Sequence, residues 1–86
     1  MRRATEIYSR EFDTRFFALP ARCRELIEAK ICELELRLES FPHHRLQGRT
    51  EFRLRVGDFR IVYEFNVQRN EPFLITLGHR REVYRH

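Results

Sequence analysis

The sequence has no long apolar run, only two cysteines and almost no lysine. No stretch approaches the roughly 18 consecutive apolar residues of a membrane-spanning helix. The opening MRRATEIYSR lacks the apolar core of a signal peptide, so we expect a cytoplasmic protein with no membrane partner. Cys23 and Cys32 lie nine residues apart, on opposite faces of a predicted helix. This spacing excludes a disulfide between them, and without a CxxC motif a zinc site is not supported.

Length and charge narrow the classes of partner. Eighty-six residues predict a single domain over 1–86, with little room for a buried small-molecule cofactor, and we expect none. Lys30 is the only lysine among 17 basic residues, so 16 are arginine, and the net charge is +4. Arginine binds phosphate bidentately and stacks on bases, which favours a nucleic acid or an acidic protein as partner. The alternative is that arginine merely replaces lysine in a GC-rich genome.

The first half of the chain has helical periodicity. We expect a short strand over 4–9, a short helix or turn over 10–20 and a long helix over 20–40, with Pro20 in its first turn. The long helix has a stripe of apolar residues at 3.6-residue spacing, which predicts its buried face. The residues of this stripe are Cys23, Leu26, Ile27, Ile31, Leu34, Leu38 and Phe41.

The second half alternates with a period of two, after a segment over 40–50 that has neither period and is predicted to be a loop. We expect strands over 51–56 and 59–66, joined by a type II′ turn at Gly57-Asp58, and a final central strand over 73–79. The order β-α-α-β-β-β predicts an α+β fold, in which two helices pack on one face of a mostly antiparallel four-stranded sheet.

The predicted hairpin places arginines opposite each other. Pairing Val56 with Phe59 puts the large apolar residues of both strands on one side and sets Arg55 opposite Arg60 on the other, with Arg53 on the same side. Like charges directly opposite across strands are destabilising, so this arrangement indicates a counter-charge from a ligand. The alternative is a solvated face.

Acidic neighbours offer another explanation for part of this charge. Glu51 and Glu64 lie on the same side and near Arg53, so they could neutralise it in part. Arg55 and Arg60 have no such neighbour in the local sequence.

The last residues, GHRREVYRH, add cations and an aromatic ring after the final strand. Arginines that bind phosphate beside a ring that stacks on a base are typical of single-stranded RNA recognition. The alternative is that Tyr84 only anchors the tail and that Arg81 is solvated.

The stretch LQGRTEFRLRVGDFRIVYEF, followed by ITLGHRREVYRH, resembles the RelE/ParE superfamily of type II toxin–antitoxin toxins, and within it the RelE-like messenger-RNA interferases. The resemblance implies a ribosome-dependent endoribonuclease that cuts mRNA in the ribosomal A site, touches 16S rRNA and is silenced by a cognate antitoxin. Arg53, Arg55, Arg60, Arg80 and Tyr84 fall where relatives carry basic residues of the sheet and the arginine and tyrosine of the tail.

Cleavage by the adjacent ribose 2′-OH needs a base, an acid and cations around the phosphate, but no metal. Tyr84 or His79 would act as base or acid, and Arg60 and Arg80 would hold the charge that develops on the phosphate. A phenol titrates near 10, and a cluster of cations favours its anion. The candidate site comprises catalytic Arg60, Arg80, Tyr84 and His79, and RNA-binding Arg53, Arg55 and Arg81.

Other interpretations stay open. His43 and His44 evoke an acid–base pair, but adjacent side chains in a loop usually diverge. A ParE-like toxin that inhibits DNA gyrase would share the fold without needing a tyrosine beside a tail arginine. A non-catalytic RNA-binding module would use the same arginines without cleavage.

Overall fold

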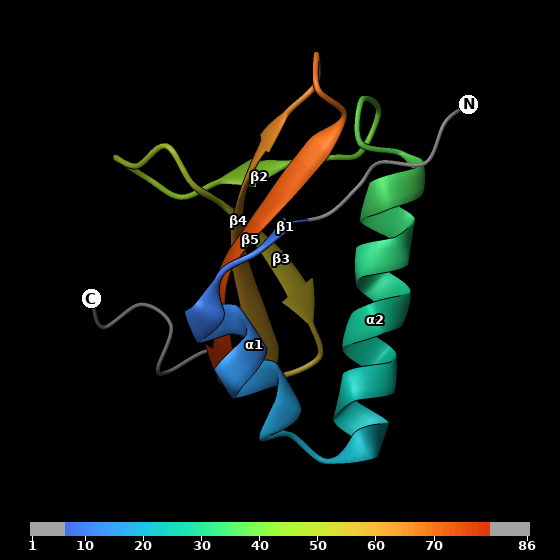
Figure 1. The fold of residues 1–86 in the computed structure, drawn as a ribbon. Helices are drawn as coiled ribbons and strands as arrows, with labels where there is room; N and C mark the ends of the chain where they lie inside the picture. Colours follow the sequence, from blue (N-terminus) through green and yellow to red (C-terminus); the bar gives the residue numbers. More distant parts are fainter. Residues whose placement is uncertain (1–6, 80–86) are drawn as a thin grey trace.

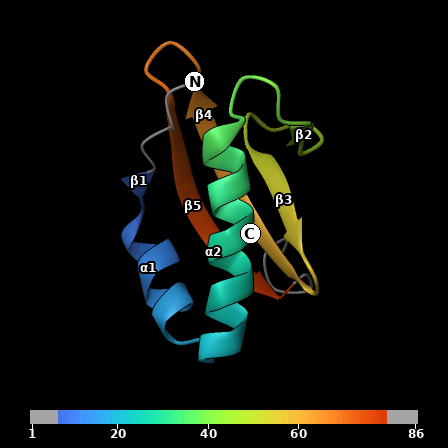
Figure 2. The same cartoon turned by 90° about the vertical axis from the view of Figure 1, so that its right-hand side faces the viewer.

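In the computed structural model, which describes residues 7–79, two helices cover one face of a five-stranded sheet (Figure 1). The elements are β1 (Ile7–Tyr8), α1 (Arg10–Phe17), α2 (Ala21–Leu36), β2 (His44–Arg45), β3 (Phe52–Val56), β4 (Phe59–Asn66) and β5 (Glu71–His79). In space the strand order is β1-β5-β4-β3-β2, with β1 parallel to β5 and all other neighbours antiparallel. The predicted α+β class is confirmed, and Figure 2 shows α2 in front of the sheet with its axis along the strands.

The sheet has one strand more than predicted. The additional strand, β2, lies within the segment 40–50 that the sequence indicated to be a loop. It has only two residues, which is too short for a period of two to show in the sequence. β2 pairs with β3 and forms the outer edge of the sheet on that side.

Ser9 connects the first helix to the sheet. Its hydroxyl oxygen accepts a hydrogen bond from the Phe12 backbone N–H at 3.0 Å, as an N-cap of α1 does. The same hydroxyl donates to the Ile75 carbonyl, and the Ser9 backbone N–H donates to the Leu74 carbonyl at 2.9 Å. Ile75 is the extra residue of a bulge where the register of β4 and β5 shifts, so one serine fixes β1, α1 and this bulge together.

The buried stripe of α2 is narrower than the sequence indicated. Ile27, Ile31 and Leu34 are buried, whereas Leu26, which was expected in the core, is 61% exposed. Leu26 precedes Ile27 by one residue, or about 100° of helix, and so points away from the sheet. Glu35 is buried instead, at 3% exposure. No helix within residues 7–79 is long and apolar enough to cross a membrane.

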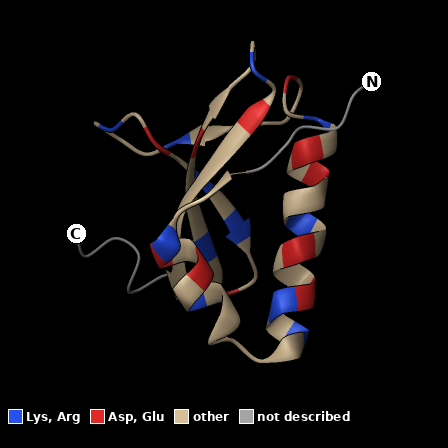
Figure 3. Ribbon diagram, viewed as in Figure 1, with Lys and Arg blue, Asp and Glu red and all other residues tan. Residues whose placement is uncertain are grey.

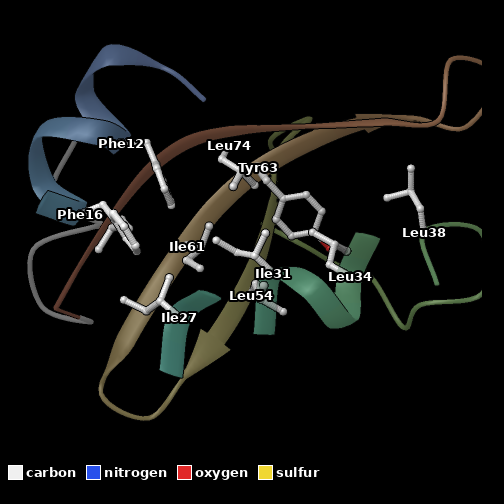
Figure 4. Close-up of a cluster of buried hydrophobic side chains, with 11 residues drawn as sticks. Phe12, Phe16, Ile27, Ile31, Leu34, Leu38, Leu54, Ile61, Tyr63 and Leu74 are labelled. Atoms are coloured by element: carbon white, nitrogen blue, oxygen red, sulfur yellow. The ribbon is translucent and has the colours of Figure 1, made fainter. Parts of the chain in front are cut away.

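The hydrophobic core lies between the helices and the sheet (Figure 4). Tyr63, on the central strand β4, is fully buried at its middle and is the largest buried side chain. The members of this core are Phe12, Phe16, Ile27, Ile31, Leu34, Leu38, Leu54, Ile61, Tyr63, Leu74 and Leu77.

The β3–β4 hairpin has the predicted register. Val56 pairs with Phe59, and Leu54 pairs with Ile61 in the core. Gly57 has a φ of +58°, and Asp58 is not among the residues with positive φ, as a type II′ turn requires. A side chain with a Cβ is strained at that φ, so glycine suits this position and the turn sets the pairing of both strands.

Candidate nucleic-acid interface

Three arginines lie on the sheet face that points away from the helices. Arg55 pairs directly with Arg60, and Arg53 lies two residues before Arg55 on β3. The residues that alternate with them, Leu54 and Ile61, are buried in the core on the other face. Figure 3 shows basic residues on β3 and β4, whereas α2 carries charges of both signs. The predicted juxtaposition of Arg55 and Arg60 is therefore present in the structure.

The exposure of these arginines differs. Arg53 and Arg55 are exposed, because β3 has only the short β2 beyond it. Arg60 lies on the central strand β4 and is only 7% exposed. The face therefore has a buried cation at its centre and two exposed cations beside it.

The guanidinium of Arg60 has an unused hydrogen-bonding edge. Its Nη1 donates to the carbonyl oxygens of Phe59 at 3.1 Å and Gly57 at 3.4 Å, while its buried Nε has no partner within the described residues. A buried donor without a partner costs about 1–3 kcal/mol. The Nε edge of a guanidinium is one that can bind phosphate or carboxylate through two parallel hydrogen bonds. The hairpin carbonyls thus hold the Arg60 guanidinium through Nη1 and leave its buried Nε without a partner in the described residues.

No carboxylate between residues 7 and 79 forms an ion pair with Arg53, Arg55 or Arg60. Glu51, which could have neutralised Arg53, instead bonds to Arg49, with 3.1 Å between Arg49 Nε and the carboxylate. The like-charge repulsion on this face is therefore not relieved by the described part of the chain.

The structure does not bring His79 onto the arginine face. His79 pairs with Phe59, and the two rings contact edge to face with 6.4 Å between their centroids. Residues alternate between faces along a strand, so His79 shares the helix side of the sheet with buried Leu77. The predicted Arg80, Arg81 and Tyr84 lie outside the described residues; in sequence they follow Gly78, which is the register partner of Arg60.

His43 points to the core and has a structural role. Its Nε2 lies 2.7 Å from the Leu38 carbonyl, which can only accept, so Nε2 carries the hydrogen. In the neutral ring Nδ1 then accepts from the Tyr63 hydroxyl, 2.6 Å away. The His43 ring stacks on Phe65 at 3.9 Å between centroids. Burial raises the pKa of the Tyr63 phenol, because a phenolate would lose its hydration there.

His44 points the other way. It pairs with Arg53 across β2 and β3, which puts its exposed side chain on the arginine face. The two adjacent side chains therefore diverge, as expected. His43 faces the core, and His44 faces the arginine side of the sheet. Sequence reasoning missed the position of His44 because it depends on the pairing of a two-residue strand, for which the sequence carries no periodic signal.

A hollow between the two helices lies away from the arginine face. A groove of about 560 Å³ between α1 and α2 is lined by aromatic residues and by four carboxylates, with no lysine or arginine. The acids are Asp13, Glu25, Glu28 and Glu35. A groove of this charge repels phosphate, so it does not compete with the arginine face as an RNA site. No group of three metal-ligating side chains occurs within the same part of the chain.

Two helices over a five-stranded, mostly antiparallel sheet match the fold of the RelE/ParE superfamily of small toxins. The family model described as "ParE toxin of type II toxin-antitoxin system, parDE" matches residues 7–84. The chain belongs to this family. A comparison with curated proteins found no match.

Solved structures share the fold at low sequence identity. The isolated RelE toxin of E. coli superposes with a TM-score of 0.75 at 21% identity, covering 94% of this chain and 90% of that one. The archaeal RelE–RelB complex from Pyrococcus horikoshii OT3 gives 0.73 at 19% identity, covering 95% and 100%. The RelBE2 toxin–antitoxin complex of Mycobacterium tuberculosis gives 0.74 at 17% identity, covering 92% and 100%.

Proposed function

We propose that this toxin is an endoribonuclease that cleaves mRNA in the ribosomal A site. The observation that carries the proposal is the face of Arg53, Arg55 and Arg60, on which no described carboxylate balances the charge. Phosphate contacts by arginine dominate the affinity of proteins for nucleic acid. We propose translated mRNA as the nucleic acid that the arginine face of this toxin binds.

The reaction proposed is attack of a ribose 2′-OH on the adjacent phosphate. It needs charge stabilisation on the phosphate oxygens and proton transfer at the 2′ and 5′ oxygens. Arg60, whose buried Nε has no partner within the described residues, and Arg80 would stabilise the phosphate. Tyr84 would transfer a proton, and the nucleophile belongs to the substrate, so no metal-bound hydroxide is required.

The remaining arginines would hold the RNA strand. Exposed Arg53 and Arg55 are suited to contacts with the backbone of mRNA or 16S rRNA, and we propose the same role for Arg81, two residues after β5 in sequence. A cognate antitoxin is proposed as the protein partner. The similar structures from P. horikoshii and M. tuberculosis are toxin–antitoxin complexes, which supports this proposal.

The second candidate is a toxin that inhibits DNA gyrase without cleaving RNA. The match of the ParE family model over residues 7–84 favours it. It differs from the first in one respect that can be measured, since a gyrase inhibitor has no use for a proton-transfer group beside the arginines.

The test is to add the purified chain to translating ribosomes and map the 5′ ends of the mRNA. We expect cuts in register with codons, lost in Tyr84→Phe and Arg80→Ala and retained in Arg22→Ala, which changes an exposed arginine on α2. Arg60→Met should also lose cleavage while keeping its fold, since replacing a buried charge by an apolar chain of similar length is often neutral. Intact mRNA together with inhibited gyrase would overturn the proposal in favour of the second candidate.

A further inference from the structure

We propose that His44 is the general base of this site and takes the proton from the ribose 2′-OH. The inference rests on the proposed nuclease function and deepens it, because it names a proton-transfer group that the sequence pattern did not indicate. It replaces His79, which the register of β4 and β5 places on the helix side of the sheet.

The position of His44 follows from the register of β2. His44 lies directly opposite Arg53, so both side chains project from the face that also bears Arg55 and Arg60. Side chains at directly opposed positions have their Cβ atoms about 4.5–5.5 Å apart. His44 is exposed, so its imidazole is available to a ligand on that face.

The charged neighbours of His44 come from β3 and the turn before it. Arg53 is opposite, and Arg55 and Glu51 occupy the two diagonal positions. Glu51 is bonded to Arg49, so the carboxylate nearest to His44 in the register already has a partner. The imidazole therefore lies beside guanidinium groups suited to phosphate, which would place the ribose of a bound nucleotide near it.

The order of strands places His44 on one side of the Arg55–Arg60 pair. Arg55 and Arg60 lie on β3 and β4, with β2 on one side of the pair and β5 on the other. Adjacent strands are about 4.8 Å apart, so β2 lies about 10 Å from β4, a span that a phosphodiester and two side chains can fill. In-line displacement puts the attacking and leaving oxygens on opposite sides of phosphorus, so the base and the acid must flank the phosphate.

Imidazole and phenol side chains both transfer protons in catalytic sites. His44 takes the 2′-OH proton as the bond from the 2′ oxygen to phosphorus forms. The bond from phosphorus to the 5′ oxygen breaks, and Tyr84, which follows β5 in sequence, donates a proton to that oxygen. The products are a 2′,3′-cyclic phosphate and a 5′-OH end.

The experiment compares the wild-type toxin with His44→Gln and with Arg45→Gln. Arg45 is the neighbouring residue of β2 on the other face, where its guanidinium lies 5.3 Å from the Phe52 ring centre. Single-turnover cleavage of ribosome-bound mRNA is measured from about pH 5 to about pH 8, the range in which imidazole changes charge. Binding is measured separately with an mRNA that carries 2′-O-methyl groups and resists cleavage.

We expect the wild-type rate to rise with pH through this range, because the base acts only when neutral. His44→Gln should cleave at least about 100-fold more slowly than the wild type, and its rate should not rise with pH. Its affinity for the methylated mRNA should stay within about three-fold of the wild type. Arg45→Gln should keep both the rate and the pH profile. In His44→Ala, added imidazole should restore part of the rate, which a merely structural role would not allow.

Two outcomes overturn different statements. If the wild-type toxin leaves mRNA intact at every pH, the proposed nuclease function fails. If the wild type cleaves and His44→Gln cleaves equally fast with the same pH profile, the nuclease stands and the assignment of His44 is wrong.

Discussion

Tyr63 carries a hydroxyl group into the middle of the core, where water does not reach it. The hydroxyl donates to His43 Nδ1, and His43 Nε2 donates to the Leu38 carbonyl just beyond α2. These two hydrogen bonds connect the end of a helix to the central strand. A buried polar group that loses its partner costs about 1–3 kcal/mol, so the pair contributes to stability only as long as both members are present.

The first prediction concerns the stability of the fold at alkaline pH. Burial raises the pKa of Tyr63, so the folded chain keeps a proton that the unfolded chain releases above about pH 10. The contribution of Tyr63 to the free energy of unfolding is complete below about pH 10. Above that pH it declines by up to about 1.4 kcal/mol per pH unit. Urea unfolding from about pH 8 to about pH 11 should show this decline in the wild type and a shallower one in Tyr63→Phe.

At neutral pH the same variant should lose about 1 kcal/mol, because His43 is left without its donor. Parallel declines in the two proteins above pH 10 would show that Tyr63 does not titrate as its burial requires.

The elements of this fold differ in how well their sequences predict them. The register and the turn of the β3–β4 hairpin were predicted correctly because the apolar alternation of its strands agrees with the Gly57-Asp58 turn. The arginine face followed directly from that register. β2 was not predicted, because two residues show no period and their strand pairing is set by a tertiary contact with β3.

The part of the candidate site that was not predicted from the sequence also depends on tertiary contacts. His44 joins the arginines only through the pairing of β2, and the buried Nε of Arg60 depends on the central place of β4. A local pattern gives the face on which a residue lies within its own element. It does not give the neighbours that the assembled sheet provides.

The second prediction concerns the junction of β1, α1 and β5. Ser9→Ala removes both the cap bond to Phe12 N–H and the hydroxyl bond to the Ile75 carbonyl. The free energy of unfolding should fall by about 1–2 kcal/mol, measured by thermal or urea unfolding. Ser9→Thr retains the hydroxyl and is the matched control. An Ala variant as stable as the wild type would show that the junction is held by other contacts.

On the scale of the whole molecule, positive charge is not spread evenly. Each helix contains an ion pair along its own length, Arg15 with Glu11 in α1 and Lys30 with Glu33 in α2. The outer face of the sheet keeps its arginines without such partners in the described part of the chain. A polyanion is therefore attracted to one region of the surface more than to the others.

The third prediction tests this localisation. Arg53→Ala or Arg55→Ala should weaken binding to ribosome-bound mRNA and lower the slope of log affinity against log salt by about one. Arg22→Ala on α2 removes an equal charge at a distant, exposed position and should change the slope much less. Binding titrations at several salt concentrations measure this, and equal effects at both places would contradict a localised site.

The divergence of His43 and His44 fixes the length of one connection. The segment from Leu38 to His44 must deliver one imidazole to Tyr63 and the next to the outer face. One residue inserted there would exchange the faces of the two rings, because side chains alternate along a strand. His43 would point outward, and the Tyr63 hydroxyl would lose its hydrogen-bond acceptor. The exposed turn over 47–50, closed by the Leu46 N–H to Glu51 carbonyl bond, carries no such restriction and is free to differ in length among related chains.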